Sequence, residues 1–277
     1  MRVAVCLPGA YFGFYAHAGF VKALERQGVT PAAVAGSSAG ALVAALWAGG
    51  CSGAEIERLL TGLRREDFWE PRRGLALARA VLTGFRGWTG LLEGDRLRVL
   101  LDRALPVRTF EECRFPLHIV TTDLTTGRRA VFQSGLLAPV VHASLAHPLL
   151  FSSVRVGESD HVDGAFVDKV PLAELLGVRA DVILVHFLRS RTAGRWPGLA
   201  RRFFAPLHLL GRGIDILRAQ ELETKLELAR VRGERVVLVE PEVPPVGVRR
   251  IAAGPAALAA AEAHAMATLP AILGGAR

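Results

Sequence analysis

Short apolar runs alternate with longer Ala- and Leu-rich segments over the first 50 residues of the chain. Residues 1–7 form an apolar run that predicts a strand in the middle of a parallel sheet. Residues 15–27 then predict a helix that ends at Gly28. A second apolar run at 30–35 leads into a second predicted helix at 39–48. Strand, helix, strand and helix in this order make a βαβ unit, which predicts an α/β fold.

The same patterns predict further elements along the rest of the chain. Helices are expected at 94–105, 139–146, 214–230 and 255–273, strands at 115–122, 129–133, 181–188 and 235–240, and a hairpin from 154–156 and 161–162. Segments 51–93 and 189–213 are less regular and rich in basic and aromatic residues. Because no repeat or low-complexity linker divides the sequence, we expect one domain over 1–277.

Composition favours a globular protein with a basic surface. The chain has 277 residues, of which 51% are hydrophobic and 22% are charged. Its formal net charge is +8, and only three of its 34 basic residues are lysines. No zinc-finger, helix-turn-helix or RNA-binding signature accompanies this charge, so we do not expect a nucleic-acid partner. An anionic membrane surface is the more interesting partner, and the alternative is a merely solvated basic surface.

Two uncharged stretches resemble membrane segments, but each is interrupted. Pro8 and Gly9 break the run at 3–21, which also lacks the basic flank of a signal peptide. Gly36-Ser37-Ser38 breaks the run at 31–51, where a spanning helix needs continuity. The cysteines are three in number and widely spaced, which argues against a disulfide framework or a zinc site. We therefore expect a cytoplasmic protein, with peripheral membrane contact as an extension.

The pentapeptide Gly36-Ser37-Ser38-Ala39-Gly40 lies at the junction of the second predicted strand and helix. A serine on such a tight turn has its hydroxyl lifted clear of the backbone and faces the positive end of the helix dipole. The flanking Gly36 and Gly40 allow the strained turn and leave room for a substrate. The pentapeptide alone also fits a small-residue turn packed under a helix. The strand before it and the helix after it favour Ser38 as a nucleophile.

A serine nucleophile needs a base and a site for the oxyanion. Asp163 lies between an apolar strand and Gly164, where desolvation would raise its pKa toward a useful value. The alternative for Asp163 is an Asx turn that closes the hairpin. The loop at 9–13 precedes a helix, so its backbone N–H groups suit a developing negative charge. That loop lacks both the dinucleotide-binding glycine pattern and a Walker lysine, so we do not expect a nucleotide there.

With these residues in place, the chain resembles the patatin-like phospholipases, which are serine acyl hydrolases with a Ser-Asp dyad. The resemblance covers about residues 2–190 and rests on motifs in the right order and spacing. The matching segments are Gly36-Ser37-Ser38-Ala39-Gly40, Asp163-Gly164-Ala165, Gly19-Phe20-Val21-Lys22-Ala23-Leu24, Asp123-Leu124-Thr125-Thr126-Gly127, and Ala143-Ser144 with 148–151.

The resemblance implies a three-layer α/β/α sandwich with a mainly parallel central sheet, completed by helices and a strand from 191–277. It implies that Ser38 attacks an ester carbonyl of a lipid, that Asp163 takes the serine proton, and that water then releases the fatty acid. It also implies an oxyanion hole formed by backbone N–H groups. It implies no metal and no other cofactor, and the pair His161-x-Asp163 is too short a pattern to indicate a metal site. The implied oxyanion-hole residues are Gly9, Ala10, Tyr11 and Gly13, and the motif-supporting glycines are Gly36, Gly40 and Gly164.

The oxyanion loop departs from the family pattern, which reads Gly-Gly-Gly-x-Arg/Lys-Gly. Here the loop is Gly9-Ala10-Tyr11-Phe12-Gly13-Phe14, without a basic residue. A left-handed backbone at Ala10 or Tyr11 would cost about 1–2 kcal/mol each. This departure keeps a catalytically weak, lipid-binding relative as an alternative. Another alternative is an α/β-hydrolase esterase with a Ser-Asp-His triad, for which His186 has the right chain order but lies inside an apolar strand.

Segment 189–213 has the composition of a membrane-contacting helix. It holds six arginines beside Trp196, Phe203 and Phe204. Leu199, Phe203, Leu207 and Leu210 would share one face of a helix, although Pro206 argues for a kink or a break. Such a face suits the headgroup boundary of a lipid surface. The alternative is that this stripe packs on the protein's own sheet.

Overall fold

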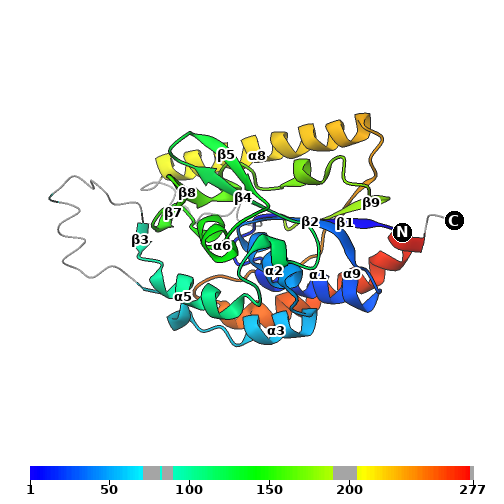
Figure 1. Ribbon diagram of the computed structural model, residues 1–277, viewed down its shortest axis with the longest axis horizontal. Helices are drawn as coiled ribbons and strands as arrows, with labels where there is room; N and C mark the ends of the chain where they lie inside the picture. The colour runs from blue at the N-terminus through cyan, green and yellow to red at the C-terminus, as the bar shows by residue number, and fades with distance from the viewer. Residues whose placement is uncertain (71–81, 83–89, 190–204, 275–277) are drawn as a thin grey trace.

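A computed structural model of the chain describes residues 1–70, 82, 90–189 and 205–274. Within them an eight-stranded sheet runs in the order β10-β9-β1-β2-β4-β8-β7, with β5 also paired to β4 (Figure 1). The strands are β1 Val3–Leu7, β2 Pro31–Ser37, β4 Leu117–Asp123, β5 Arg128–Phe132, β7 Val154–Val156, β8 Ser159–Asp163, β9 Val182–His186 and β10 Val236–Val239. A separate pair joins β3 Gly90–Leu92 to β6 Leu149–Phe151.

The sheet is mainly parallel, as expected. Strands β10, β9, β1, β2 and β4 run parallel to one another, whereas β5 and β8 pair antiparallel with β4 and β7 pairs antiparallel with β8. The central strands are apolar because both of their faces are covered. Along β1, Val3, Val5 and Leu7 join the core on one face, and Ala4 and Cys6 join the core on the other.

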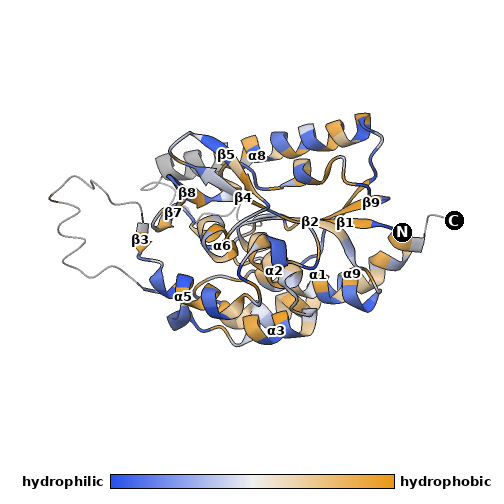
Figure 2. Ribbon diagram, in the orientation of Figure 1, coloured by the Kyte–Doolittle hydropathy of each residue, from blue (hydrophilic) through white to orange (hydrophobic). Residues whose placement is uncertain are grey.

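Helices cover both faces of the sheet, which confirms the three-layer α/β/α architecture. Figure 1 places α8 on one face and α1, α2, α3 and α9 on the other. Figure 2 colours β1 and β2 as hydrophobic, whereas α3 and α8 alternate between hydrophilic and hydrophobic residues. The helices are α1 Phe14–Arg26, α2 Ala39–Gly49, α3 Gly53–Thr61, α5 Asp95–Ala104, α6 Leu137–Leu145, α8 Ala205–Val231 and α9 Gly254–Gly274. Short 3-10 turns are η1 Arg65–Asp67, η2 Phe110–Glu112, η3 Gly164–Phe166, η4 Leu172–Leu175 and η5 Ile251–Ala253.

Most predicted elements are confirmed with shifts of a few residues, but α8 begins nine residues before the predicted start at 214, and helix α3 and the short strands β3 and β6 were not predicted. Helix α3 lies inside 51–93, which the sequence pattern left irregular. Ser52 caps it by accepting from the Glu55 backbone, and the Glu55 side chain accepts from the Ser52 N–H in return. Ile56 and Leu60 bury its apolar face. The Ser-x-x-Glu spacing is a capping-box signal that was present in the sequence.

The C-terminal helix α9 packs along α1. A Cβ at Gly19 of α1 would collide with the Leu258 carbonyl oxygen of α9, so the two backbones approach closely. Leu258, Ala261, Ala265 and Leu269 of α9 are buried at helical spacing. The segment Ile251–Gly274 is also long and apolar enough to cross a membrane by length and composition. Because core helices pass the same test, this property alone does not assign it to a membrane.

Candidate active site

Ser38 stands on a strained turn between β2 and α2. Its backbone angles are φ 52° and ψ −123°, a region that L-residues rarely occupy. Such a conformation costs on the order of 1–3 kcal/mol and needs support from its surroundings. A Cβ at Gly36 would lie 2.8 Å from Ala41 Cα, and one at Gly40 would overlap the Leu7 carbonyl oxygen. Both glycines are therefore required because the backbone approaches itself closely around the turn.

The structure brings Ser38 and Asp163 into contact. The Ser38 hydroxyl donates a hydrogen bond of 2.7 Å to Asp163 Oδ2, and the Ala165 N–H donates one of 2.8 Å to Oδ1. Asp163 ends β8, where it pairs with Thr121 of β4. Its side chain is buried, and this burial raises the pKa of Asp163 above its ordinary value of 3.8, against the opposing hydrogen bonds from Ser38 and Ala165. A raised pKa makes this carboxylate a stronger base than an exposed one.

Two other serines hold the turn in place. The Ser38 N–H donates to Ser144 Oγ at 2.9 Å, and the Ser144 hydroxyl donates to the Val120 carbonyl at 2.7 Å. The Ser37 hydroxyl donates to the Asp168 carbonyl at 2.9 Å. Adjacent serines thus have different partners, and Ser38 is the one that contacts the carboxylate. The sequence singled out Ala143-Ser144 as a matching segment without giving Ser144 a role.

The loop at 9–13 lies beside Ser38, but its N–H groups are not equivalent. The Gly9 N–H donates to the Lys169 carbonyl at 2.8 Å, and the Gly13 N–H donates to the Ala10 carbonyl at 2.9 Å. These two N–H groups are engaged, which departs from the expected set of four oxyanion donors. Within the residues that the structure describes, the Ala10 and Tyr11 N–H groups have no hydrogen-bond acceptor.

The strain in this loop also lies elsewhere than expected. Phe12 has a positive φ of 53°, whereas Ala10 and Tyr11 do not. The left-handed backbone considered for Ala10 or Tyr11 is therefore not found at either residue. Gly9 is needed for a different reason: a Cβ there would collide with Ala165 and lie 3.3 Å from Ser38 Cβ.

An apolar cavity of about 420 Å³ opens onto Ser38 and Asp163. Its volume is in the range of small-molecule sites. Aliphatic and aromatic side chains from several elements form most of its wall, among them Leu42, Leu97, Leu100, Leu145 and Phe151. Tyr11 and Phe166 line the cavity while remaining 63% and 45% exposed, so they stand at its mouth.

The family model for patatin-like phospholipases matches residues 5–176, more than half of the chain. The chain belongs to the patatin-like phospholipase family. An uncharacterized NTE family protein of Mycobacterium tuberculosis is 30% identical over 196 residues, which are 70% of this chain and 51% of that protein. A putative patatin-like phospholipase domain-containing protein of Caenorhabditis elegans is 27% identical over 171 residues, 61% of this chain and 15% of that protein. The chain thus spans about half the length, or less, of these curated relatives.

The patatin-like fold is also seen in a solved structure. The crystal structure of VipD from Legionella pneumophila aligns with a TM-score of 0.50 and 14% sequence identity. The alignment covers 96% of this chain and 67% of that one. At this identity the likeness shows the shared fold, and it extends beyond residue 176 to the helices and strands that complete the layers.

In the described residues of this patatin-like chain, no hydrogen bond connects His186 with Ser38 or Asp163. Its ring is buried and stacks on Phe20 with ring centres 4.4 Å apart. Its Nδ1 lies 2.8 Å from Nδ1 of His17, whose Nε2 lies 2.9 Å from the Pro8 carbonyl oxygen. Because a carbonyl only accepts, His17 Nε2 carries the proton, so His186 Nδ1 donates to His17 Nδ1. His186 is a core histidine, as its place in an apolar strand suggested.

Two other expectations concern residues around the site. His161 Nδ1 lies 2.8 Å from Thr121 Oγ1, and no cluster of three or more metal-ligating side chains occurs among the described residues. The apolar stripe of 189–213 lies largely outside the described residues, which resume at 205. Contact of that segment with a membrane therefore stays a prediction.

Proposed function

We propose that this protein hydrolyses carboxylic esters of lipids through a Ser38–Asp163 dyad. The observation that carries the proposal is the 2.7 Å hydrogen bond from Ser38 Oγ to a buried carboxylate in the wall of an apolar cavity. Family membership supports hydrolysis of a lipid ester in general, and the geometry suggests which residues perform it. A serine next to a base of raised pKa is the arrangement that nucleophilic catalysis requires.

In the proposed reaction Ser38 Oγ attacks the ester carbonyl while its proton moves to Asp163 Oδ2. The tetrahedral intermediate collapses, the alcohol leaves with that proton, and the acyl group remains on Ser38. Asp163 then takes a proton from water, which attacks the acyl group and releases the fatty acid with the Ser38 hydroxyl restored. The Ala165 N–H bond to Oδ1 keeps the carboxylate oriented throughout.

We assign the oxyanion to the N–H groups of Ala10 and Tyr11, the two members of the predicted set that have no hydrogen-bond acceptor among the described residues. Those of Gly9 and Gly13 already donate to backbone carbonyls, so they serve to shape the loop. The loop precedes α1, whose N-terminal end favours negative charge. A single oxyanion donor is typically worth about 3 kcal/mol of transition-state stabilisation, so two suffice for a functional hole.

The cavity suits an acyl chain, and its mouth suits a lipid surface. Tyr11 and Phe166 are exposed, and the basic residues Lys169 and Arg189 line the same cavity. Aromatic and basic residues together favour the boundary between lipid headgroups and acyl chains. We propose that the mouth meets a lipid surface and that residues 1–277 act as one domain. The cytoplasmic location stays a prediction.

Labelling with a fluorophosphonate, followed by peptide mapping, tests the dyad. We expect modification of Ser38 alone, and no modification in Ser38→Ala. Asp163→Asn should lower hydrolysis of a p-nitrophenyl acyl ester about as severely as Ser38→Ala, because the two residues act as a unit. Ser134→Ala, at an exposed loop serine, is the matched control and should behave like the wild type.

Two results would overturn the proposal. Unchanged ester hydrolysis by Ser38→Ala would remove the nucleophile, and modification at another serine would relocate it. A folded wild-type protein that binds lipid but neither reacts with the probe nor hydrolyses the ester would favour the lipid-binding alternative, which the atypical loop containing Phe12 supports.

A further inference from the structure

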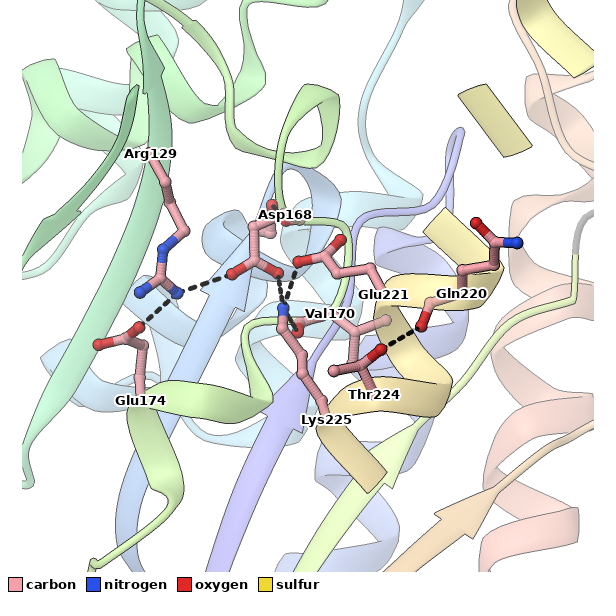
Figure 3. Close-up of polar contacts among 9 residues, drawn as sticks. Arg129, Asp168, Val170, Glu174, Gln220, Glu221, Thr224 and Lys225 are labelled. Carbon is pink, nitrogen blue, oxygen red and sulfur yellow. Dashed lines mark hydrogen bonds and ion pairs between the residues drawn. The ribbon is translucent and has the colours of Figure 1, made fainter. Parts of the chain in front are cut away.

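Asp168 is a fully buried acidic residue, five positions after Asp163. Its Oδ2 accepts from Arg129 Nη1 of β5 at 2.9 Å, and its Oδ1 lies 2.5 Å from Lys225 Nζ of α8 (Figure 3). Arg129 and Lys225 come from elements far apart in the sequence. The Asp168 side chain therefore ties the edge of the sheet to the helix that covers one of its faces.

The backbone of Asp168 contacts both turns of the proposed active site. Its carbonyl oxygen accepts the hydroxyl of Ser37 at 2.9 Å, directly beside Ser38. Its N–H donates to the Gly164 carbonyl at 2.9 Å, directly after Asp163. One residue thus holds the neighbour of the proposed nucleophile and the neighbour of the proposed base.

Two cationic side chains, Arg129 and Lys225, hold three carboxylates together around Asp168. Figure 3 shows Glu174 on the far side of Arg129 and Glu221 beside Lys225. The N–O distance is 2.6 Å in both of these ion pairs. Lys225 Nζ also donates to the Val170 carbonyl at 2.8 Å. A buried carboxylate is tolerated only when it is paired, and loss of one partner leaves an uncompensated charge.

We propose that Asp168 is a positioning residue for the Ser38–Asp163 pair, held in place by Arg129 and Lys225. The inference rests on the proposed function of that pair. Without Lys225, Arg129 would have to balance the carboxylates of both Asp168 and Glu174, so the Asp168 side chain would turn away from α8 and draw the segment 164–168 with it. Asp163 Oδ2 would then move away from Ser38 Oγ, while the apolar wall of the cavity would stay. The expected effect is therefore on kcat rather than on KM.

Lys225→Met is the test, and Lys22→Met is the matched control. Lys22 is also a mostly buried lysine with two carboxylate partners, Glu57 at 2.6 Å and Glu262 at 3.0 Å. It lies among α1, α3 and α9, on the face of the sheet opposite α8 (Figure 1). Both variants should lower Tm. Only Lys225→Met should lower kcat for a soluble p-nitrophenyl ester, by about 10- to 100-fold, because a displacement near 1 Å has that effect.

A double variant separates positioning from general loss of stability. Asp168→Asn combined with Lys225→Met removes both charges and keeps the Asp168 backbone contacts, so kcat should recover relative to Lys225→Met alone. Hydrogen exchange at 164–168 should speed up in Lys225→Met and slow again in the double variant. Equal kcat in Lys225→Met and Lys22→Met, with unchanged exchange at 164–168, would overturn the proposal.

The readouts also separate this inference from the proposed function. If Ser38→Ala hydrolyses the ester as well as the wild type, the dyad is wrong, and exchange at 164–168 then decides alone whether Asp168 holds the segment. If Lys225→Met does not fold, Ser37→Ala replaces it, since this variant breaks only the hydroxyl contact to the Asp168 carbonyl. A fall in its kcat of several-fold with KM unchanged supports the inference, and an unchanged kcat opposes it.

Discussion

Mild acid should destabilise this protein partly through one buried histidine, His17. Burial lowers the pKa of His17 from its ordinary value of 6.5 to about 4, and its ring is held between the Pro8 carbonyl and His186. The unfolded chain therefore binds a proton at His17 at a higher pH than the folded protein does. The contribution of His17 to the free energy of unfolding is fully present above the pKa that His17 has in the unfolded chain. It is lost as the pH drops from about 6.5 toward about 4.

The lowered pKa of His17 sets the size of this loss of unfolding free energy. One pKa unit corresponds to about 1.4 kcal/mol, so lowering the pKa from 6.5 to about 4 sets a limit near 3 kcal/mol. Over the interval from about pH 7 to about pH 5, the unfolded state gains most of its proton and the folded state gains little. The loss of unfolding free energy from His17 over that interval is about 2 kcal/mol.

Urea unfolding of the wild type and His17→Gln, each at about pH 7 and about pH 5, measures this contribution. Glutamine keeps an amide that can donate to the Pro8 carbonyl but does not titrate. Between the two pH values the wild type should lose about 2 kcal/mol more than His17→Gln. His147→Gln, at an exposed histidine, should follow the wild type. Parallel losses in the wild type and His17→Gln would refute the reasoning.

Three further outcomes are expected. Phe12→Gly should lower the free energy of unfolding, because the lost packing of the Phe12 ring against Phe14 and Phe68 outweighs the roughly 1–2 kcal/mol that glycine gains from relief of the positive φ; a gain in urea unfolding would contradict this. Ser144→Ala leaves the Ser38 N–H without its acceptor, so it should cost about 1–3 kcal/mol and slow fluorophosphonate labelling of Ser38; an unchanged labelling rate would count against this role. Asp163→Asn should unfold at higher urea concentration than the wild type at neutral pH while losing hydrolysis, because burial raises the pKa of Asp163 and its charged form is disfavoured; a lower urea midpoint would show the opposite.

The early part of the fold could be predicted because its signals are local. Short apolar runs bounded by Pro8 and by glycines mark β1 and β2, and the helices between them follow from composition. The turn at Ser38 was visible for the same reason, since a strand, a small-residue pentapeptide and a helix are contiguous. Its contact with Asp163 joins positions 125 residues apart; the local pattern made Asp163 a candidate base, and the family resemblance strengthened the pairing.

The parts that could not be predicted depend on tertiary partners. The Gly9 N–H is engaged by the carbonyl of Lys169, and nothing near Gly9 in the sequence announces that acceptor. Asp168 pairs with Arg129 and Lys225, 39 and 57 positions away, and its neighbours in the sequence do not indicate these partners. Helix α3 is a different case, because its Ser52–Glu55 capping box is a local signal that the sequence contains.

The position of β1 has a consequence for any shortened form of the protein. β1 lies between β2 and β9, and β9, β10 and α9 all follow the residues that the family model matches, 5–176. A truncation at 176 would therefore turn β1 from an interior strand into a bare sheet edge, with the whole Val3–Leu7 backbone unpaired on one side. It would also uncover the flank of α1 that α9 covers. An apolar, unprotected edge strand is a template for intermolecular pairing, so such a fragment should aggregate rather than stand alone as a smaller enzyme.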